Sequence, residues 1–276
     1  MTWCPDARPL YHAALDGGYA LPAYNVCSLE MAKGCLEAAD AAGRPVILQT
    51  YPADIEQASP HVFAQLIRAL ADEVSVPVAL HLDHGRDVNQ VIACLRAGYG
   101  SVMFDGQGLP FDETLQMTAH LAAIAHASGA ALEVSAESFG VPSANDNVLD
   151  TTDPEKARAL RDAGADLVAC AVGSEHGHAS RIDLSLLSAI QARVGGPLVL
   201  HGGSGIHPGD LRAALDFGVT KVNVGSALYR AVRAAWVATT DLPTHRTGYA
   251  SIRAAVRDVA APYLDLLNPH KGTVHD

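Results

Sequence analysis

Short runs rich in β-forming residues alternate with helical patterns along the chain, and this alternation constrains the fold more than any other feature. The runs recur at intervals of about 25–35 residues, the size of one strand–helix unit. Most are continuously apolar, as is typical of parallel strands covered on both faces. We predict strands at Ala20–Val26, Pro45–Thr50, Pro77–Asp83, Ser101–Gly106, Ala131–Glu137, Asp166–Gly173, Pro197–Gly202 and Thr220–Gly225.

The sequence also marks the ends of the helices between these runs. Asp153, Pro154 and Glu155 are typical of an N-cap, a first helical residue and an acidic first turn. Helical patterns end a few residues before the next strand at Gly43, Gly98, Gly129, Gly164 and Gly218. Strict alternation favours a closed (β/α)8 barrel, the TIM barrel, over an open doubly wound sheet. We expect residues 1–276 to form one barrel domain with a C-terminal helix at 247–267.

Composition and charge exclude several classes of protein. Of the 276 residues, 49% are hydrophobic and 18% are charged, so the chain can bury a large core. No apolar run approaches the ~18 residues of a membrane span, and no basic segment followed by an apolar one opens the chain. The net charge of −11 disfavours nucleic acid and anionic membranes as partners. The five scattered cysteines contain no C-x-x-C pair, so we expect reduced thiols in a cytoplasmic protein.

Histidines stand at the ends of three predicted strands, as His84, His176 and His201. The carboxyl ends of barrel strands meet at one mouth, where barrel enzymes carry their chemistry. Three neutral imidazoles with one open position are the ligand set of a catalytic zinc ion, which can polarise a carbonyl and stabilise an enolate. We therefore predict one Zn²⁺ per subunit at this mouth, with Co²⁺ or Mn²⁺ as alternative occupants of similar ligands.

Other polar residues gather at the same predicted mouth. Asp83 directly precedes a histidine; it could move a proton on a carbon beside a metal-bound carbonyl or orient a metal ligand, and the spacing leaves both roles open. Glycine-rich turns follow the seventh and eighth predicted strands, where barrels commonly hold phosphate with backbone amides. Because Gly202, Gly203, Ser204 and Ser226 lie in these turns, we expect an anion there.

Two segments are specific enough to indicate a family. Val78–Gly85 reads VALHLDHG and Leu200–Ile206 reads LHGGSGI. Both resemble signatures of the class II, zinc-dependent ketose-bisphosphate aldolases, which include fructose-bisphosphate and tagatose-bisphosphate aldolases. The resemblance covers nearly the whole chain through Pro22–Asn25, Val102–Gly106, Gly173–Gly177 and Gly218–Asn223. It implies reversible aldol cleavage of a ketose phosphate to dihydroxyacetone phosphate and an aldehyde.

The resemblance also implies roles for matched residues. His84, His176 and His201 would hold the zinc, and Asp83 would exchange a proton with the acceptor hydroxyl. Zinc would stabilise the enediolate in place of a lysine Schiff base, for which Lys221, beside Val222 and Asn223 on alternating faces, is poorly suited. Asp105 and Glu133 would support the metal ligands from behind.

The family resemblance assigns the donor half of the substrate, dihydroxyacetone phosphate, to a further set of residues. A monovalent cation would lie near Gly177, Gly202 and Ser204. The residues that would bind substrate or phosphate are Asn25, Gly177, Gly202, Gly203, Ser204, Asn223 and Ser226.

The sequence departs from the family at three functional places. Ser135 replaces the family's second glutamate, and the loop glutamate that would transfer a proton at the donor carbon is missing at its aligned position. Glu137 shares a strand face with Glu133 and Ser135 but lies nearer the mouth, so it is either the substitute carboxylate or a solvated acid. Leu242 stands where relatives carry an arginine that reaches a neighbouring subunit's second phosphate.

These observations predict a metal-dependent class II aldolase, in a homodimer or homotetramer, that acts on a sugar phosphate other than fructose 1,6-bisphosphate. Two alternatives stay open at this stage. A non-catalytic, aldolase-like partner subunit would explain the lost glutamates, although the retained Asp83 and three histidines argue against it. A metal-dependent sugar-phosphate epimerase or isomerase would keep the enediolate chemistry without the cleavage.

Overall fold

The computed structural model describes residues 2–135, 151–174, 178–239 and 244–269. The strands are β1 (Leu21–Asn25), β2 (Val46–Thr50), β3 (Val78–Gly85), β4 (Ser101–Asp105), β5 (Ala131–Ser135), β6 (Leu167–Cys170), β7 (Leu198–Leu200) and β8 (Val219–Val224). The helices are α1 (Arg8–Gly17), α2 (Leu29–Ala42), α3 (Pro52–Ala71), α4 (Val88–Ala97), α5 (Phe111–Ala127), α6 (Pro154–Asp162), α7 (Leu184–Val194), α8 (Pro208–Ala214), the 3-10 turn η1 (Leu215–Phe217), α9 (Ser226–Ala238) and α10 (His245–Leu266).

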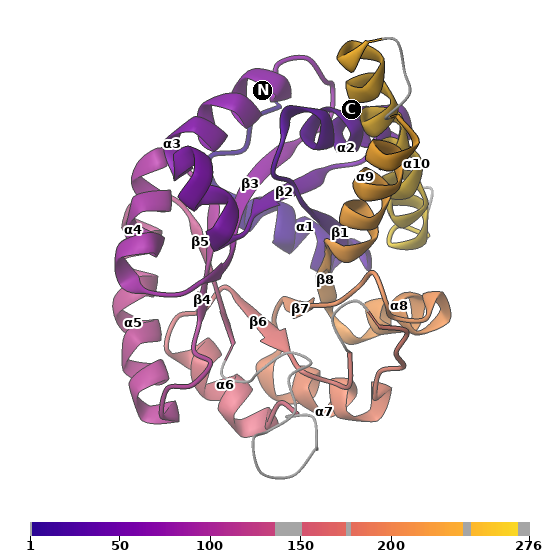
Figure 1. The fold of residues 1–276 in the computed structure, drawn as a ribbon. Helices are drawn as coiled ribbons and strands as arrows, with labels where there is room; N and C mark the ends of the chain where they lie inside the picture. The colour runs from indigo at the N-terminus through magenta and orange to yellow at the C-terminus, as the bar shows by residue number, and fades with distance from the viewer. Residues whose placement is uncertain (1, 136–150, 175–177, 240–243, 270–276) are drawn as a thin grey trace.

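The strands form one closed parallel barrel in chain order, and pairing of β1 with β8 completes the ring. Helices surround the strands on the outside (Figure 1). This arrangement confirms the predicted (β/α)8 barrel and excludes the open sheet, because an open sheet would leave β1 and β8 at separate edges.

Most predicted helix boundaries are confirmed. Asp153 caps α6 by accepting a 2.8 Å hydrogen bond from the backbone N–H of Glu155. Gly43 and Gly98 follow α2 and α4 with φ of +64° and +93°, a left-handed conformation that suits glycine and ends a helix. The expected C-terminal helix is α10, which begins two residues earlier than predicted, at His245.

Two predicted strands are too long. β6 ends at Cys170 and β7 at Leu200, three and two residues before the predicted ends. The physical reason is local, because Gly173 and Gly202 have φ of +98° and +72°, which an extended strand does not allow. The chain therefore turns into the loops of the mouth sooner than its apolar pattern indicates.

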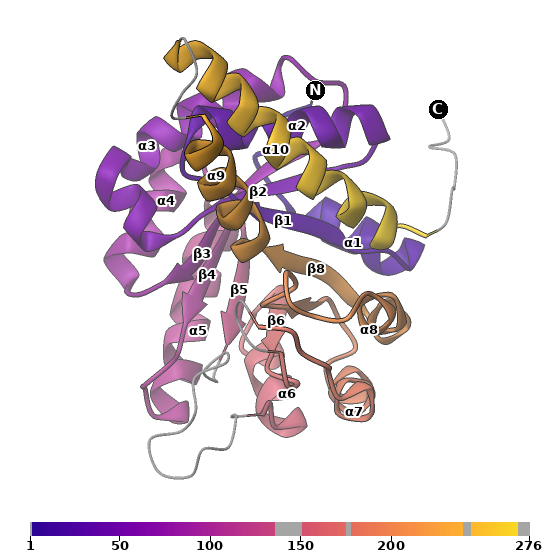
Figure 2. The same cartoon turned by 45° about the vertical axis from the view of Figure 1, so that its right-hand side comes forward.

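The last two helices pack on one side of the barrel. Helix α10 lies along α2 and α9, and Figure 2 shows it crossing outside both. In the part of the chain that the structure describes, no helix combines the length and apolar character needed to cross a membrane.

The barrel interior has two layers that differ in chemistry. Helix α1 covers the end where the strands begin, and its Tyr11 reaches Ser101 with an oxygen–oxygen distance of 3.2 Å. The apolar layer packs on α1 and consists of Leu21, Ala23, Ile47, Ala79, Met103, Ala131, Leu167, Ala169 and Val199. The polar layer lies nearer the mouth and consists of Asn25, Gln49, His81, Asp83, Glu133, His201, Lys221 and Asn223.

Candidate active site

A pocket of about 580 Å³ opens at the mouth, above the polar layer. It brings together side chains from the ends of several strands, as the sequence predicts for a barrel. Its lining residues are Asn25, Tyr51, Ala53, Asp54, Asp83, His84, Asp105, Gln107, Gly202, Ser204, Asn223, Gly225, Ser226 and Tyr229.

Both Asp83 and His84 face this pocket, although consecutive strand residues normally point to opposite faces. The exception has a backbone cause. The pairing of β3 with β4 shifts register between Leu82 and Gly85, and His84 has a φ of +54°. This left-handed residue turns the imidazole inward beside Asp83, and non-glycine residues adopt such a conformation rarely and often at functional sites.

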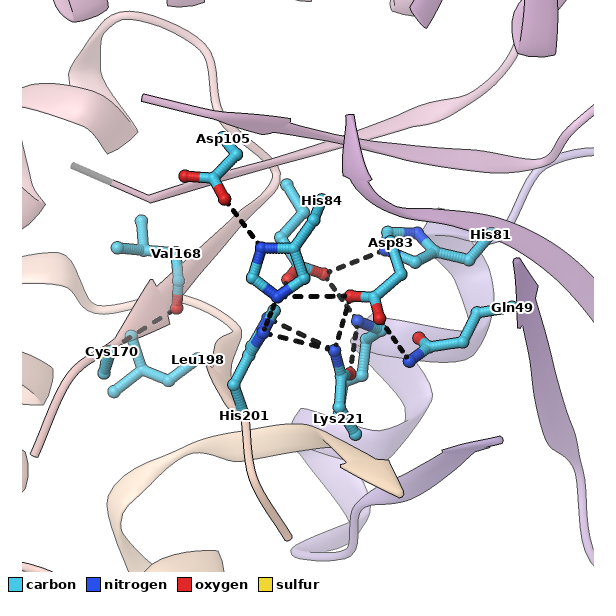
Figure 3. A network of polar contacts seen from close by, with 12 residues as sticks. Gln49, His81, Asp83, His84, Asp105, Val168, Cys170, Leu198, His201 and Lys221 are labelled. Carbon is cyan, nitrogen blue, oxygen red and sulfur yellow. Dashed lines mark hydrogen bonds and ion pairs between the residues drawn. The ribbon is translucent and has the colours of Figure 1, made fainter. Parts of the chain in front are cut away.

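The imidazoles of His84 and His201 meet over the polar layer. Nε2 of His84 lies 3.0 Å from Nδ1 of His201. The other ring nitrogen of each histidine contacts a carboxylate, with Nδ1 of His84 at 2.7 Å from Asp105 and Nε2 of His201 at 2.9 Å from Glu133. Figure 3 shows His84 between Asp105 and His201. Asp105 and Glu133 thus lie on the far sides of the two histidines.

This geometry fits a divalent metal. A carboxylate that accepts the proton of one ring nitrogen leaves the other nitrogen as a lone-pair donor. Two such donors then face each other across 3.0 Å, close to the separation of about 3.3 Å that two nitrogen ligands have on a tetrahedral zinc ion. Asp83, His84 and His201 each offer a ligand atom, and these atoms lie within 4.8 Å of one another.

The structure thus brings together two of the three predicted histidines. Three other predicted residues, His176, Gly177 and Glu137, lie outside the described residues.

Asp83 is only 4% exposed and is held by amide groups on both oxygens. Asn25 and Gln49 donate to Oδ2 at 2.7 and 3.2 Å, and Asn223 donates to Oδ1 at 2.9 Å. Burial by itself raises the pKa of Asp83, but His84, His201, Lys221 and the hydrogen bond from Asn25 outweigh it and hold the pKa below its ordinary value. The carboxylate is therefore ionised and fixed in direction.

The carboxylate behind His84 behaves similarly. Burial raises the pKa of Asp105, but its hydrogen bond and charge interaction with His84 lower it overall. Burial lowers the pKa of His84, and the charges of Asp83 and Asp105 raise it above the ordinary value. His84 therefore lies in a strongly negative surrounding, which also favours a bound cation.

Most of the predicted anion-binding residues converge on the pocket. Gly202, Ser204, Asn223 and Ser226 line it near the first turn of α9, and the dipole of a helix favours negative charge at this end. Ser204 Oγ accepts a 3.1 Å hydrogen bond from the backbone N–H of Ala227, which ties the loop after β7 to this helix.

Gly203 lies behind the pocket lining and plays a packing role. A Cβ at Gly203 would lie 2.8 Å from the backbone oxygen of Asn223, so only glycine allows the loop after β7 to approach β8 this closely.

Several residues in or beneath the pocket were given no place in the site by the sequence. Gln49 and Lys221 face inward beneath the pocket, and Tyr51, Asp54 and Tyr229 line its rim. Gln49 lies two residues after the inward-facing Ile47, and Lys221 lies two residues before Asn223, so strand alternation contained the signal for both. The rim residues belong to helix beginnings and carry no comparable pattern.

The fold and the site define a (β/α)8-barrel protein with a polar, metal-competent pocket at the mouth where barrel enzymes act. The model of the family described as "Fructose-bisphosphate aldolase class-II" matches residues 6–271. The chain is 36% identical over 232 residues to the fructose-bisphosphate aldolase of Streptococcus pyogenes serotype M1, covering 80% of this chain and 78% of that one. It is 34% identical over 258 residues to the fructose-bisphosphate aldolase of Mycoplasma pneumoniae, covering 88% of each chain.

Solved structures agree with this match. The YdjI aldolase of Escherichia coli K12 superimposes with a TM-score of 0.85 at 27% identity, over 95% of this chain and 96% of that one. The fructose-bisphosphate aldolase of Campylobacter jejuni has the same fold, with a TM-score of 0.79 at 22% identity, over 95% of this chain and 94% of that one.

The chain belongs to the class II fructose-bisphosphate aldolase family. It is accordingly an aldolase, a lyase that acts on a carbon–carbon bond. Members of this family generally use a divalent metal, and the group of Asp83, His84 and His201 can hold one.

Proposed function

We propose that the chain cleaves a ketose phosphate reversibly into dihydroxyacetone phosphate and an aldehyde, with a divalent metal, zinc, at the mouth of the barrel. The observation that carries the proposal is the pair of imidazole nitrogens 3.0 Å apart beside the ionised, amide-bound Asp83. A general base next to a carbonyl-polarising site is the arrangement that aldol chemistry needs.

His84 and His201 would hold the metal, with His176 as the third ligand. A bound divalent ion would polarise the substrate ketone and stabilise the negative charge that develops as the carbon–carbon bond breaks. Asp105 and Glu133 would keep both imidazoles in the tautomer that offers a lone pair to the ion. A monovalent cation near Gly202 and Ser204 is part of the same proposal.

Asp83 would carry the proton of the acceptor half. In the cleavage direction its carboxylate accepts the proton of the hydroxyl on the acceptor carbon, and it returns this proton in synthesis. Three amide N–H groups from Asn25, Gln49 and Asn223 direct both carboxylate oxygens, so the base is oriented before substrate binds. Glu137 is proposed to transfer the proton at the donor carbon.

The lining of the pocket supports a substrate other than fructose 1,6-bisphosphate, although curated relatives carry that substrate in their names. Among the described residues of the lining, none is lysine or arginine, and Asp54, Asp83 and Asp105 are acidic. One phosphate would meet backbone amides at the start of α9, whereas the described lining offers a second phosphate no arginine for a bidentate contact. We therefore propose a short, uncharged or differently charged acceptor half.

A substrate panel on the metal-defined protein tests this proposal. The protein is stripped with a chelator, reloaded with Zn²⁺, Co²⁺ or Mn²⁺, and assayed for dihydroxyacetone phosphate release from ketose 1-phosphates and from fructose 1,6-bisphosphate. We expect metal-dependent cleavage of a ketose 1-phosphate. Cleavage of fructose 1,6-bisphosphate with kcat/KM above roughly 10⁴ M⁻¹s⁻¹ would refute the substrate proposal. Loss of a phosphate group without cleavage, or no turnover on the panel, would refute the reaction.

Structures of loaded protein test the ligand assignments. With zinc bound, His84, His176 and His201 should lie at ~2.0–2.1 Å from the ion, and imidazoles pointing apart would contradict the site. Soaked inorganic phosphate should bind between Ser204 and Ser226, whereas binding only at a distant surface would contradict the anion site. Homodimer or homotetramer formation and a cytoplasmic location also stay predictions, and analytical ultracentrifugation measures the first.

A further inference from the structure

A lysine lies at the centre of the polar layer without any role in the proposed reaction. Lys221 on β8 is fully buried, a rare condition for a lysine. Its Nζ lies 2.8 Å from Oε2 of Glu133 and 2.7 Å from Oδ1 of Asn223. Lys221 is not among the described residues that line the pocket. Its direct contacts with these two neighbours are therefore its structural links to the pocket, beside the charge that it adds near Asp83.

The first branch from Lys221 leads to Asp83. An ammonium group has three donors and no acceptor, so the atom of Asn223 that faces it must be the amide oxygen. The amide nitrogen of Asn223 then points the other way and donates to Oδ1 of Asp83 at 2.9 Å. If the Asn223 amide were flipped, its NH2 group would face the ammonium of Lys221 and its oxygen would face the carboxylate of Asp83. Both contacts would then be repulsive. Lys221 therefore fixes which end of Asn223 meets the proposed base.

The second branch leads to a proposed metal ligand. Glu133 is fully buried, and its Oε1 lies 2.9 Å from Nε2 of His201. Its Oε2 lies 2.8 Å from Nζ of Lys221 and 3.5 Å from Nε2 of His81. A buried carboxylate needs a paired cation to stay ionised. Because Lys221 supplies that cation, Glu133 can accept the His201 proton and leave Nδ1 facing His84.

We propose that Lys221 is a positioning residue that sets two parts of the active site together: the amide direction of Asn223 toward Asp83, and the tautomer of His201 through Glu133. The inference rests on the proposed function for its consequence in turnover. It also gives a structural reason why Lys221 is a poor Schiff-base candidate, since its amine is bound beneath the pocket by a carboxylate and an amide oxygen.

Two variants separate positioning from simple charge balance. Lys221→Met leaves Glu133 as an uncompensated buried charge, and we expect a lower melting temperature and metal affinity reduced by about tenfold or more. The double variant Glu133→Gln with Lys221→Met removes both charges and keeps a side-chain oxygen for His201. We expect it to recover thermal stability and metal affinity to within about threefold, while kcat stays at least about tenfold below native with little change in KM, because Asn223 is no longer fixed.

The matched control lies next to Lys221 on the same strand. Thr220 is also fully buried, and its hydroxyl donates to the backbone oxygen of Leu198 at 3.4 Å. Thr220→Val should leave kcat, KM and metal affinity at native values. If the double variant turned over at the native rate, Lys221 would serve charge balance alone and the proposal would be overturned.

If the variants do not fold, a measurement on the native protein tests the proposal instead. A neutron structure should show three deuterons on Nζ of Lys221, one directed at Asn223 Oδ1, and one of the two Asn223 amide deuterons directed at Oδ1 of Asp83. A neutral lysine or a reversed amide would overturn the proposal. This readout and metal affinity are independent of turnover, so a failure of the proposed reaction on every substrate would be distinguishable from a failure of this inference.

Discussion

The two layers of the barrel interior are built from the same strands, yet different interactions hold them together. On β3 the inward side chains run from Ala79 to His81 to Asp83, and on β2 from Ile47 to Gln49. Two residues nearer the mouth on the same strand, the inward side chain is polar and hydrogen-bonded instead of apolar and packed. Helix α1 seals the apolar end, and the pocket opens at the polar end.

The comparison teaches where stability and function are located. Apolar side chains gain free energy from burial without any directional partner. Buried polar groups gain little net free energy and cost much when a partner is lost, so a network such as Asp83, Asn223, Lys221 and Glu133 must be satisfied as a whole. We therefore expect changes in the apolar layer to affect folding, and changes in the polar layer to affect chemistry.

The largest expected effect is on turnover in the polar layer. Asp83→Ala removes the proposed proton carrier and should lower kcat by ~10²–10⁴-fold, because general base catalysis contributes about that factor. Metal content, measured by elemental analysis of the same preparation, should stay native. If metal and activity fell together, Asp83 would orient the metal site and the proton role would be wrong.

The apolar layer should respond in the opposite way. Ile47 is fully buried between the strand positions of Ala23 and Ala79. Ile47→Ala should lower the free energy of unfolding by about 2–5 kcal/mol through lost burial and an unfilled cavity. Denaturant titration measures this loss. The kcat of the folded fraction should be native, and a tenfold fall would show that the two layers are coupled more tightly than their chemistry indicates.

A smaller effect is expected behind the proposed metal ligands. Asp105→Asn keeps the shape of the side chain but weakens the acceptor that holds Nδ1 of His84 at 2.7 Å. Metal affinity should fall by about 10–100-fold, as is usual when the partner of a ligating histidine is changed. Competition with a chelator of known affinity measures it. Unchanged affinity would mean that Asp105 does not set the His84 tautomer.

The smallest expected effect is on stability, and it concerns an ion pair at the start of α1. Burial raises the pKa of Asp6, but hydrogen bonds from Arg8, including one of 2.6 Å, lower it below the ordinary 3.8. A depressed carboxyl pKa stabilises the fold above the ordinary value, and this contribution is lost as pH falls through the folded value. Asp6→Asn should cost about 0.2–1 kcal/mol at pH 7.

The pH dependence gives this prediction its control. The stability difference between native protein and Asp6→Asn should shrink as the pH falls below 3.8, because the native carboxyl then becomes neutral too. Thermal melts at pH 7 and below pH 3.8 measure it. A difference that grew on acidification would contradict the sign of the shift.

Much of this protein could be read from its sequence. Alternation of apolar runs and helical patterns predicted the strand order and the closed barrel, and glycines such as Gly43 and Gly98 predicted helix ends because only a left-handed residue fits there. The motifs around Asp83, His84 and His201 predicted the family and the mouth of the barrel as the site. These features are local, since they depend on residue type and spacing along one segment.

Other features were decided only by the tertiary structure. Strand alternation alone would turn His84 away from Asp83, and a register shift with a φ of +54° brings both into the pocket. Lys221 appeared in the sequence as an unsuitable Schiff-base lysine, whereas barrel closure places it against Glu133 of β5, 88 residues earlier in the chain. The sequence by itself determined the barrel and the chemistry of its mouth. Which charges pair inside it depends on the stagger of eight strands around a ring, a property of the closed sheet and of no single strand.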